Sequence, residues 1–356
     1  MLREACFTWN HALSLQKRYY SLYSKFIDKN KLQKHFAKRI KRTLLHSQTV
    51  QDIIQRLDES YKRFFKKLAK RPPKFKRHSQ FSSFKYKQGG FTINGNAIAL
   101  NTIKKVFKFS KSREFEGNVK TVTIKRTPLG EYYLIIVTDA NPKKYGKTHI
   151  GASVGIDFGL KTYLNMSDGS TIQNPLFLKE NLSDLKRKSR KLSKCKKGSN
   201  NRNKARLSFN RTHEKVTNSR EDFQWKLAHQ LCGQYDYIFL EDLSLTGMTR
   251  LWGRKMSDLA HASFVDKLFQ VSKKYGVTVH KIDRWYASSK SCSCGEINKS
   301  ISLKDREWTC VHCGSINARD LLAAQNILRK GISELESLHK TDLSAVNACI
   351  QESPVL

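Results

Sequence analysis

The sequence predicts an α/β domain in its second half, preceded by a helical region and a β-rich region. Three observations predict this class. Apolar residues first recur at spacings of three and four, β-rich segments between turn residues follow, and strand-like and helix-like segments then alternate. We place the three regions at residues 1–73, 74–148 and 149–356.

The first region is predicted to be helical over residues 3–71, and Pro72-Pro73 is expected to end it. Its clearest apolar face consists of Val50, Ile53, Ile54, Leu57, Tyr61, Phe64, Phe65 and Leu68. In the second region, residues 91–100, 119–126 and 132–137 are rich in β-forming residues and are separated by Gly, Asn and Pro turns. We therefore expect a small antiparallel β unit, with residues 141–147 as a polar linker.

The alternation of strand-like and helix-like segments begins near His149. Strands are expected at residues 154–157, 162–165, 237–241 and 278–282, and helices at 223–232 and 256–275. In the second helix, Leu259, Phe264, Leu268 and Val271 should face inward. Residues 186–206 include 11 basic residues and no acid, which indicates a solvated helical hairpin, a flexible loop or a surface that follows phosphates.

Charge is the unusual feature of the composition. The 356 residues include 67 Lys and Arg against 30 Asp and Glu, a formal net charge of +37. Repulsion of this size favours a polyanionic partner, and nucleic acid is the obvious one. A purely structural basic protein is the alternative. The 39% hydrophobic and 10% aromatic residues argue against a disordered chain.

Neither a transmembrane run nor a signal peptide is predicted, so we expect a cytoplasmic, nucleoid-associated protein of a bacterial-type cell with no membrane partner. In that compartment, the 8 cysteines are expected to be metal ligands or free thiols.

Three acids adjoin apolar segments. Asp157 follows a strand in VGIDFG, Glu241 closes another in YIFLEDL, and Asp320 opens a helix in ARDLLAAQNIL. Acids beside buried strands are costly to desolvate without a cationic neighbour. If the three converge, they can hold Mg²⁺, which prefers oxygen ligands, and two such ions would suit phosphodiester hydrolysis. Any one of these acids alone is weak evidence.

The segments VGIDFGLKTYLNMSDG, IFLEDL and SKSCSCG…WTCVHCGSINARDLLAAQNIL resemble the three RuvC motifs and the inserted zinc finger of TnpB proteins. WNHALSLQKRYY and RPPKFK resemble the N-terminal half of that family, so the resemblance covers nearly the whole chain.

The resemblance implies an RNase H-like (RuvC) nuclease domain with an inserted zinc ribbon, a helical recognition region and a β-rich wedge. It also implies an RNA-guided DNA endonuclease with a guide RNA and a double-stranded DNA target next to a short flanking motif. Asp157, Glu241 and Asp320 fall on the family's metal-binding acids. Two departures stand out: family members usually have a further strand-forming segment before the text ACFTWN, and Leu322 stands where they usually have Asn.

The cysteines predict a second metal site. Cys310 and Cys313 form a Cys-x-x-Cys pair, and Cys292 and Cys294 form a shorter Cys-x-Cys pair. Four thiolates at this spacing predict one Zn²⁺ in a ribbon at about residues 288–316, although the shorter pair strains tetrahedral closure. The alternative is four free thiols in a loop.

Candidate nucleic-acid contacts lie in two segments. Residues 82–88, expected to form a loop, contribute Lys85, Tyr86 and Gln88, and Gln88 is a possible adenine reader. The basic run contributes Lys186, Arg187, Lys188 and Arg190. An ordinary hairpin surface and a solvated helix are the alternatives.

Three other functions remain open: a nuclease-inactive RNA-guided DNA-binding regulator, an RNA-independent transposase, and a zinc-finger DNA-binding protein. The regulator would be expected to lack an acid, and the zinc-finger protein leaves the acids unexplained. Bound RNA separates the guided nuclease and the guided regulator from the transposase and the zinc-finger protein. Cleavage in Mg²⁺ separates the nuclease from the regulator.

Overall fold

The computed structural model describes residues 1–39, 44–141, 143–146, 151–243, 253, 256, 258–302 and 305–340. His149, where the second domain was expected to begin, lies outside these residues. The chain divides into two compact units, Met1–Asn141 and Pro142–Leu356, so the boundary falls in the predicted linker.

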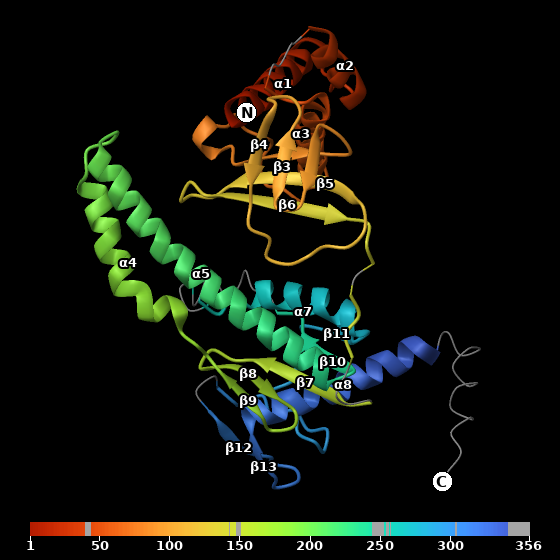
Figure 1. Cartoon of the computed structure of the whole chain (residues 1–356). Helices are drawn as coiled ribbons and strands as arrows, with labels where there is room; N and C mark the ends of the chain where they lie inside the picture. Colours follow the sequence, from red (N-terminus) through yellow and green to blue (C-terminus); the bar gives the residue numbers. More distant parts are fainter. Residues whose placement is uncertain are drawn as a thin grey trace. The chain divides into compact units, whose positions relative to one another are not determined.

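The first unit combines three helices with two three-stranded antiparallel sheets (Figure 1). Its helices are α1 (Leu2–Tyr23), α2 (Lys29–Arg39) and α3 (Ser47–Phe65), followed by the 3₁₀ turn η1 (His78–Gln80). One sheet has the order β1-β5-β6 and the other β2-β3-β4. The strands are β1 (Ser83–Tyr86), β2 (Phe91–Asn94), β3 (Ala97–Leu100), β4 (Lys105–Lys108), β5 (Val119–Arg126) and β6 (Tyr132–Thr138).

The helices and strands of this unit share one hydrophobic core. Trp9 of α1, Ile53 of α3, Tyr86 of β1 and Val122 of β5 are buried in the same cluster. The division drawn at residue 73 from the sequence runs through this core, so we treat residues 1–141 as one unit.

The apolar face predicted on α3 is shorter than expected. Ile53, Ile54 and Leu57 are buried, but the helix ends at Phe65, well before the prolines, and Phe65 and Leu68 are exposed. Tyr61 is also buried in this core, so the buried face ends one turn after Leu57.

The second unit is built on a five-stranded mixed sheet of order β11-β10-β7-β8-β9. β10 is parallel to both β7 and β11, whereas β7, β8 and β9 are antiparallel neighbours. The strands are β7 (Ser153–Phe158), β8 (Thr162–Met166), β9 (Thr171–Gln173), β10 (Tyr237–Glu241) and β11 (Thr278–Ile282). The predicted strands at 237–241 and 278–282 are confirmed with the same bounds.

Helices cover both faces of this sheet (Figure 1). On β10, Ile238 and Leu240 pack into the core with α5 and α7, whereas Phe239 packs with Ile327 of α8. Alternation along a strand therefore separates the two faces. The helices are α4 (Phe177–Lys194), α5 (Asn200–Gln234), α7 (His261–Tyr275) and α8 (Arg319–Lys340).

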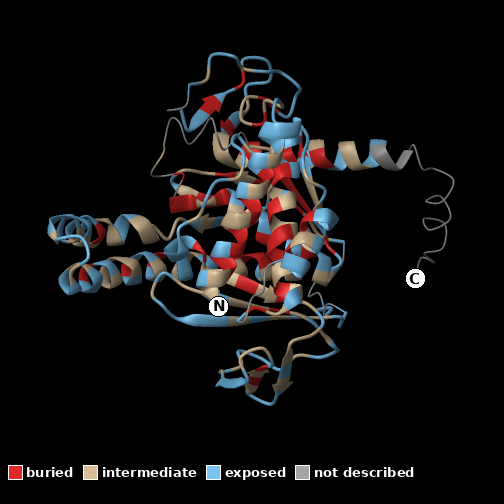
Figure 2. Ribbon diagram, turned by 90° about the horizontal axis from the view of Figure 1, so that it is seen from above, coloured by how far each residue is buried: buried red, intermediate tan, exposed pale blue. Residues whose placement is uncertain are grey.

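The basic run, residues 186–206, forms the C-terminal half of α4, the turn and the first residues of α5. The helical hairpin, one of the three forms predicted for it, is therefore confirmed. The 35 residues of α5 extend for roughly 50 Å at the usual helical rise. Only the C-terminal part of α5 packs on the sheet, and most residues of the hairpin away from it are exposed or intermediate (Figure 2).

The segment between β11 and α8, residues 288–318, is hereafter the cysteine ribbon. It contains the antiparallel hairpin of β12 (Glu307–Thr309) and β13 (Ile316–Ala318), and β13 leads directly into α8. Cys292, Trp308, Cys310 and Leu322 form a small core between the ribbon and α8. Among the described residues, no helix is long and apolar enough to cross a membrane.

Candidate functional site

Strand geometry places Asp157 and Glu241 on the same face of the sheet. A Cβ on Gly155 would lie 2.1 Å from the Ala324 carbonyl oxygen, so this position of β7 faces α8. Asp157 is two residues further on and faces the same way. Glu241 likewise follows Phe239 by two residues and shares its α8-facing side.

The two strands also bring these acids level with each other. β7 and β10 are parallel neighbours in which Ile156 pairs with Leu240, so Asp157 and Glu241 occupy the next pair at the carboxyl ends. Asp320 lies in the first turn of α8, where the helix dipole favours a negative charge. The three acids line one pocket of about 560 Å³, together with the cations Lys161, Lys290, Arg306 and Arg319.

Electrostatics identify Asp157 as the central acid. Burial raises the pKa of Asp157 to about 6, and Asp320 adds to the effect. Burial and then Asp157 raise the pKa of Glu241 to about 7. Because Asp157 interacts with both other acids, a cation that neutralised it would relieve both repulsions.

The structure also distinguishes Glu241 from the adjacent Asp242. Asp242 is hydrogen-bonded to Arg284, and its Oδ1 lies 3.5 Å from Lys281 Nζ. These partners, Arg284 first, lower the pKa of Asp242. Asp242 is therefore neutralised by its own ion pairs, whereas Glu241 belongs to the group of repelling acids.

The four predicted cysteines converge in the ribbon. Cys292, Cys294, Cys310 and Cys313 have sulfur atoms that all lie within 4.8 Å of one another. The Cys292–Cys313 and Cys294–Cys310 sulfur pairs are each 3.6 Å apart. Four sulfurs at about 2.3 Å from a tetrahedral zinc are roughly 3.8 Å from each other, so these residues fit one Zn²⁺.

Local turns explain why the shorter Cys-x-Cys pair still joins the cluster. Gly295 and Gly314 follow the two pairs at positive φ, and each donates its N–H to a cysteine carbonyl, Cys292 and Cys310 respectively. The Ser315 hydroxyl lies 3.3 Å from Cys292 Sγ and 3.2 Å from Cys313 Sγ. Its hydrogen bond lowers the pKa of Cys292, which favours the thiolate that a metal requires.

The three acids fit metal in a different way. In the part of the chain that the structure describes, the cysteines are the group that closes to 4.8 Å, and the carboxylates are spread more widely around their pocket. Carboxylate oxygens are the ligands that Mg²⁺ prefers, so the chemistry of this pocket fits that ion.

The predicted nucleic-acid contacts in the first unit need correction. Residues 83–86 form strand β1 and are not a loop, and they pair with β5. Tyr86 is fully buried, which removes it as a nucleic-acid contact. Lys85 is half-buried on the other face of β1, and Gln88 is exposed just beyond the strand.

On the hairpin, two of the predicted cations have partners within α4. Asp184 lies 2.5 Å from Arg187 and 2.6 Å from Lys188. Lys186 and Arg190 are exposed.

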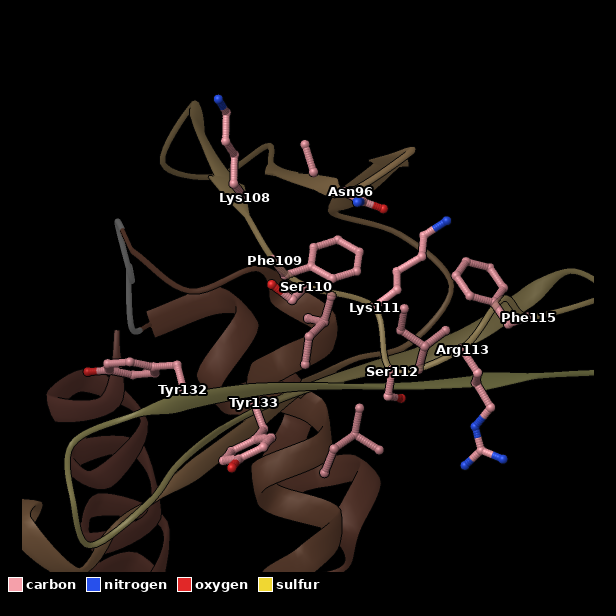
Figure 3. Close-up of a pocket in the computed structure, with 14 residues that line it drawn as sticks. Asn96, Lys108, Phe109, Ser110, Lys111, Ser112, Arg113, Phe115, Tyr132 and Tyr133 are labelled. Carbon is pink, nitrogen blue, oxygen red and sulfur yellow. The ribbon is translucent and has the colours of Figure 1, made fainter.

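Sequence reasoning missed a basic groove in the first unit. A hollow of about 1130 Å³ lies between β6 and the segment of residues 108–115 (Figure 3). Its lining includes the cations Lys108, Lys111 and Arg113 and the aromatic residues Phe109, Phe115, Tyr132 and Tyr133. Tyr132 and Tyr133 are 63% and 54% exposed. The text VFKFSKSREF, in which aromatic and basic residues alternate, was the available signal.

The second unit, with its three carboxylates on one pocket and its cysteine ribbon, is similar to two known protein families. The family model OrfB_IS605, described as "Probable transposase", matches residues 136–251. The model "Cas12f1-like, TNB domain" matches residues 261–327.

A protein of Streptomyces pristinaespiralis named "Putative RNA-guided DNA endonuclease" is 30% identical over 289 residues, which cover 80% of this chain and 71% of that protein. "Putative RNA-guided DNA endonuclease InsQ" of Escherichia coli K12 is 27% identical over 92% of this chain and 87% of its own. The chain belongs to the TnpB family.

The fold also matches a solved structure. A chain of the "Cryo-EM structure of the Cas12f1-sgRNA-target DNA complex" superposes with a TM-score of 0.59 over 91% of this chain and 80% of its own, at 14% identity. At that identity the likeness concerns the fold.

Proposed function

We propose that this protein is an RNA-guided DNA endonuclease with an RNase H-like (RuvC) nuclease domain. In this proposal it hydrolyses phosphodiester bonds of guide-matched DNA next to a short flanking motif. The observation that carries the proposal is the convergence of Asp157, Glu241 and Asp320 on one pocket from β7, β10 and α8. The relatives named as putative RNA-guided DNA endonucleases support the guided activity.

The three carboxylates would hold two Mg²⁺ ions, which when bound activate a water and stabilise the charge that develops on the leaving oxygen. Asp157, which interacts with both other acids, would be the central metal ligand. The ends of β7 and β10 would fix two of the acids against the target phosphate, because Asp157 pairs with β8 and Glu241 pairs with β11, which leaves the backbone little freedom there. Lys161 and Lys290, which line the same pocket, would attract the DNA backbone.

The guide RNA is the proposed partner of the groove in the first unit. Unpaired bases stack on exposed aromatic rings, and lysine and arginine contact the phosphates between them. Tyr132 and Tyr133 supply rings, and Lys108 and Arg113 supply charge. The cysteine ribbon would carry one structural Zn²⁺ on its four thiolates.

The decisive experiment replaces Asp157 with Ala. Cleavage of a guide-matched duplex in Mg²⁺ should fall by more than about a hundredfold, since even residues behind metal ligands contribute about 10- to 100-fold. RNA binding and guided DNA binding should persist, because they depend on cations spread over the surface.

Asp242→Asn is the matched control, because Asp242 is an acid beside Glu241 whose charge is taken up by Arg284 and Lys281. It should cut at close to the wild-type rate. Cleavage by the Asp157→Ala variant at the wild-type rate would refute the assignment of the three carboxylates as the nuclease site. A wild-type protein that binds guided targets and never cuts would instead be a regulator.

A further inference from the structure

The hairpin of β12 and β13 connects the two candidate metal sites. At one end, its turn carries Cys310 and Cys313, and Cys310 N–H donates to the Ser315 carbonyl at 2.8 Å. At the other end, Arg319 N–H donates to the Arg306 carbonyl at 2.8 Å, immediately before Asp320. A hairpin with three residue pairs is marginal by itself, so its register depends on what closes its ends.

The register of the β12–β13 hairpin places Arg306 next to Asp320. Arg306 Nη1 donates to Asp320 Oδ2 at 2.7 Å, across 14 residues of chain. Both side chains line the pocket that Asp157 and Glu241 also line. Their side chains are 51% and 37% exposed, so water reaches the pair and the contact can be exchanged.

We propose that Arg306 is a positioning residue that competes with divalent metal for Asp320, so that the cysteine ribbon sets the metal affinity of the acid pocket. The inference rests on the proposed function in that Asp320 is taken as a metal ligand. A guanidinium and a divalent cation both require the anionic oxygens of the carboxylate, and occupation by one opposes the other. The pair also keeps the Asp320 side chain at the pocket rim before metal arrives.

The expected effect is modest. An exposed ion pair contributes up to about 1 kcal/mol, which corresponds to a change of about two- to fivefold in a dissociation constant. Removal of Arg306 should tighten metal binding by that factor, because the Asp320 carboxylate loses its competing partner.

The test measures Mn²⁺ binding to full-length, zinc-loaded protein by electron paramagnetic resonance, with no RNA or DNA present. Arg306→Gln should bind Mn²⁺ about two- to fivefold more tightly than the wild type. Arg306→Lys should restore most of the wild-type affinity. Lys299→Gln, which removes an exposed cation elsewhere on the ribbon, should leave the affinity unchanged. Asp157→Ala should weaken binding, which assigns the signal to this pocket.

A double-mutant cycle separates competition from a structural effect. In an Asp320→Asn background, Arg306→Gln should no longer change the Mn²⁺ affinity, because the shared carboxylate is gone. Zinc content should be the same in every variant. Equal or weaker Mn²⁺ binding by Arg306→Gln, or the same gain in the Asp320→Asn background, would overturn the proposal. So would the absence of Mn²⁺ binding in both wild type and Arg306→Gln.

This assay is independent of the guided activity. If cleavage fails while Arg306→Gln still tightens Mn²⁺ binding, the endonuclease proposal is lost and the competition stands. If cleavage proceeds in Mg²⁺ and the Mn²⁺ affinities do not differ, the endonuclease proposal stands and the competition by Arg306 is refuted.

Discussion

Asp157 and Glu241 are kept close together in spite of their repulsion because β7 and β10 pair with each other up to the residues just before them, Ile156 and Leu240. Each acid is itself in a paired strand, Asp157 opposite Asn165 of β8 and Glu241 opposite Ile282 of β11. The backbone pairing holds what the side chains alone would push apart. Burial raises the pKa of Asp157 to about 6, with Asp320 adding to the effect, and burial followed by the charge of Asp157 raises the pKa of Glu241 to about 7. A site of this kind lowers stability where it would bind metal, as functional sites commonly do.

A pH-dependent stability follows. Both carboxyls have higher pKa values in the folded chain than their ordinary values of 3.8 and 4.5. Their contribution to stability is therefore complete below about pH 4 and is lost as the pH rises through about 7. In Mg²⁺-free buffer, Glu241→Gln should raise the unfolding free energy near pH 7.5 by on the order of 2 kcal/mol and flatten its fall with pH.

Urea unfolding between pH 4.5 and 8 measures this difference. Asp242→Asn is the control of opposite sign, because the pKa of Asp242 is lowered and its charged form stabilises the fold. Equal pH profiles for wild type and Glu241→Gln would refute the raised pKa of Glu241.

At the scale of elements, α8 determines where the third acid lies, and two glycines let it approach the sheet. A Cβ on Gly155 of β7 would lie 2.1 Å from the Ala324 carbonyl oxygen, and one on Gly331 of α8 would lie 2.1 Å from the Phe239 ring. Both distances are too short for a side chain, so α8 packs directly against the sheet at these two glycine positions.

Gly155→Ala should therefore push α8 outward and separate Asp320 from Asp157. We expect a loss of about 2 kcal/mol or more in unfolding free energy, because overpacking a core is destabilising, and a large loss of cleavage. Gly233 lies within helix α5, and a Cβ added there would be 3.9 Å from the Tyr275 ring, an ordinary contact distance. Gly233→Ala should therefore be neutral or stabilising. A Gly155→Ala protein with wild-type melting and cleavage would show that α8 can shift without cost.

Much of this architecture could be predicted from local pattern. β5, β10 and β11 were predictable because their apolar runs are bounded by turn or polar residues. β1 was missed because it is four residues long and is defined by pairing with β5, in which Ser83 meets Lys125. The face shared by Asp157 and Glu241 follows from strand alternation, whereas the contact of Arg306 with Asp320 depends on a hairpin register that no local pattern specifies.

Zinc should be bound at about one ion per chain, since a closed tetrahedral site takes one. Cys310→Ser should lose most of the metal, and Cys195→Ser, which removes a thiol far from the cluster in sequence, should retain it. Metal analysis after purification without chelator decides this. Less than about a tenth of an ion in the wild type would mean that the short Cys-x-Cys turn does not support the four-ligand site.

At the scale of the whole molecule, we expect the net charge of +37 to contribute more to the proposed affinity for nucleic acid than any single contact. Neutralised phosphates release counterions, so the logarithm of affinity should fall linearly with the logarithm of salt concentration. The groove in the first unit offers a way to divide that affinity into charge and stacking, because Lys108 and Arg113 line it together with exposed tyrosines.

We expect the two contributions to respond differently to mutation. Replacement of both Lys108 and Arg113 with Gln should reduce the salt slope by about two, or about one for each lost phosphate contact. Tyr132→Ala should weaken binding of a single-stranded RNA by about 1–3 kcal/mol with little change in slope, because stacking releases no counterions. Lys25→Gln, an exposed cation outside the groove, is the control for total charge. Filter binding at a series of salt concentrations measures both quantities. A flat salt response in the wild type would refute charge-driven binding, and an unchanged slope in the double variant would exclude the groove as a phosphate contact.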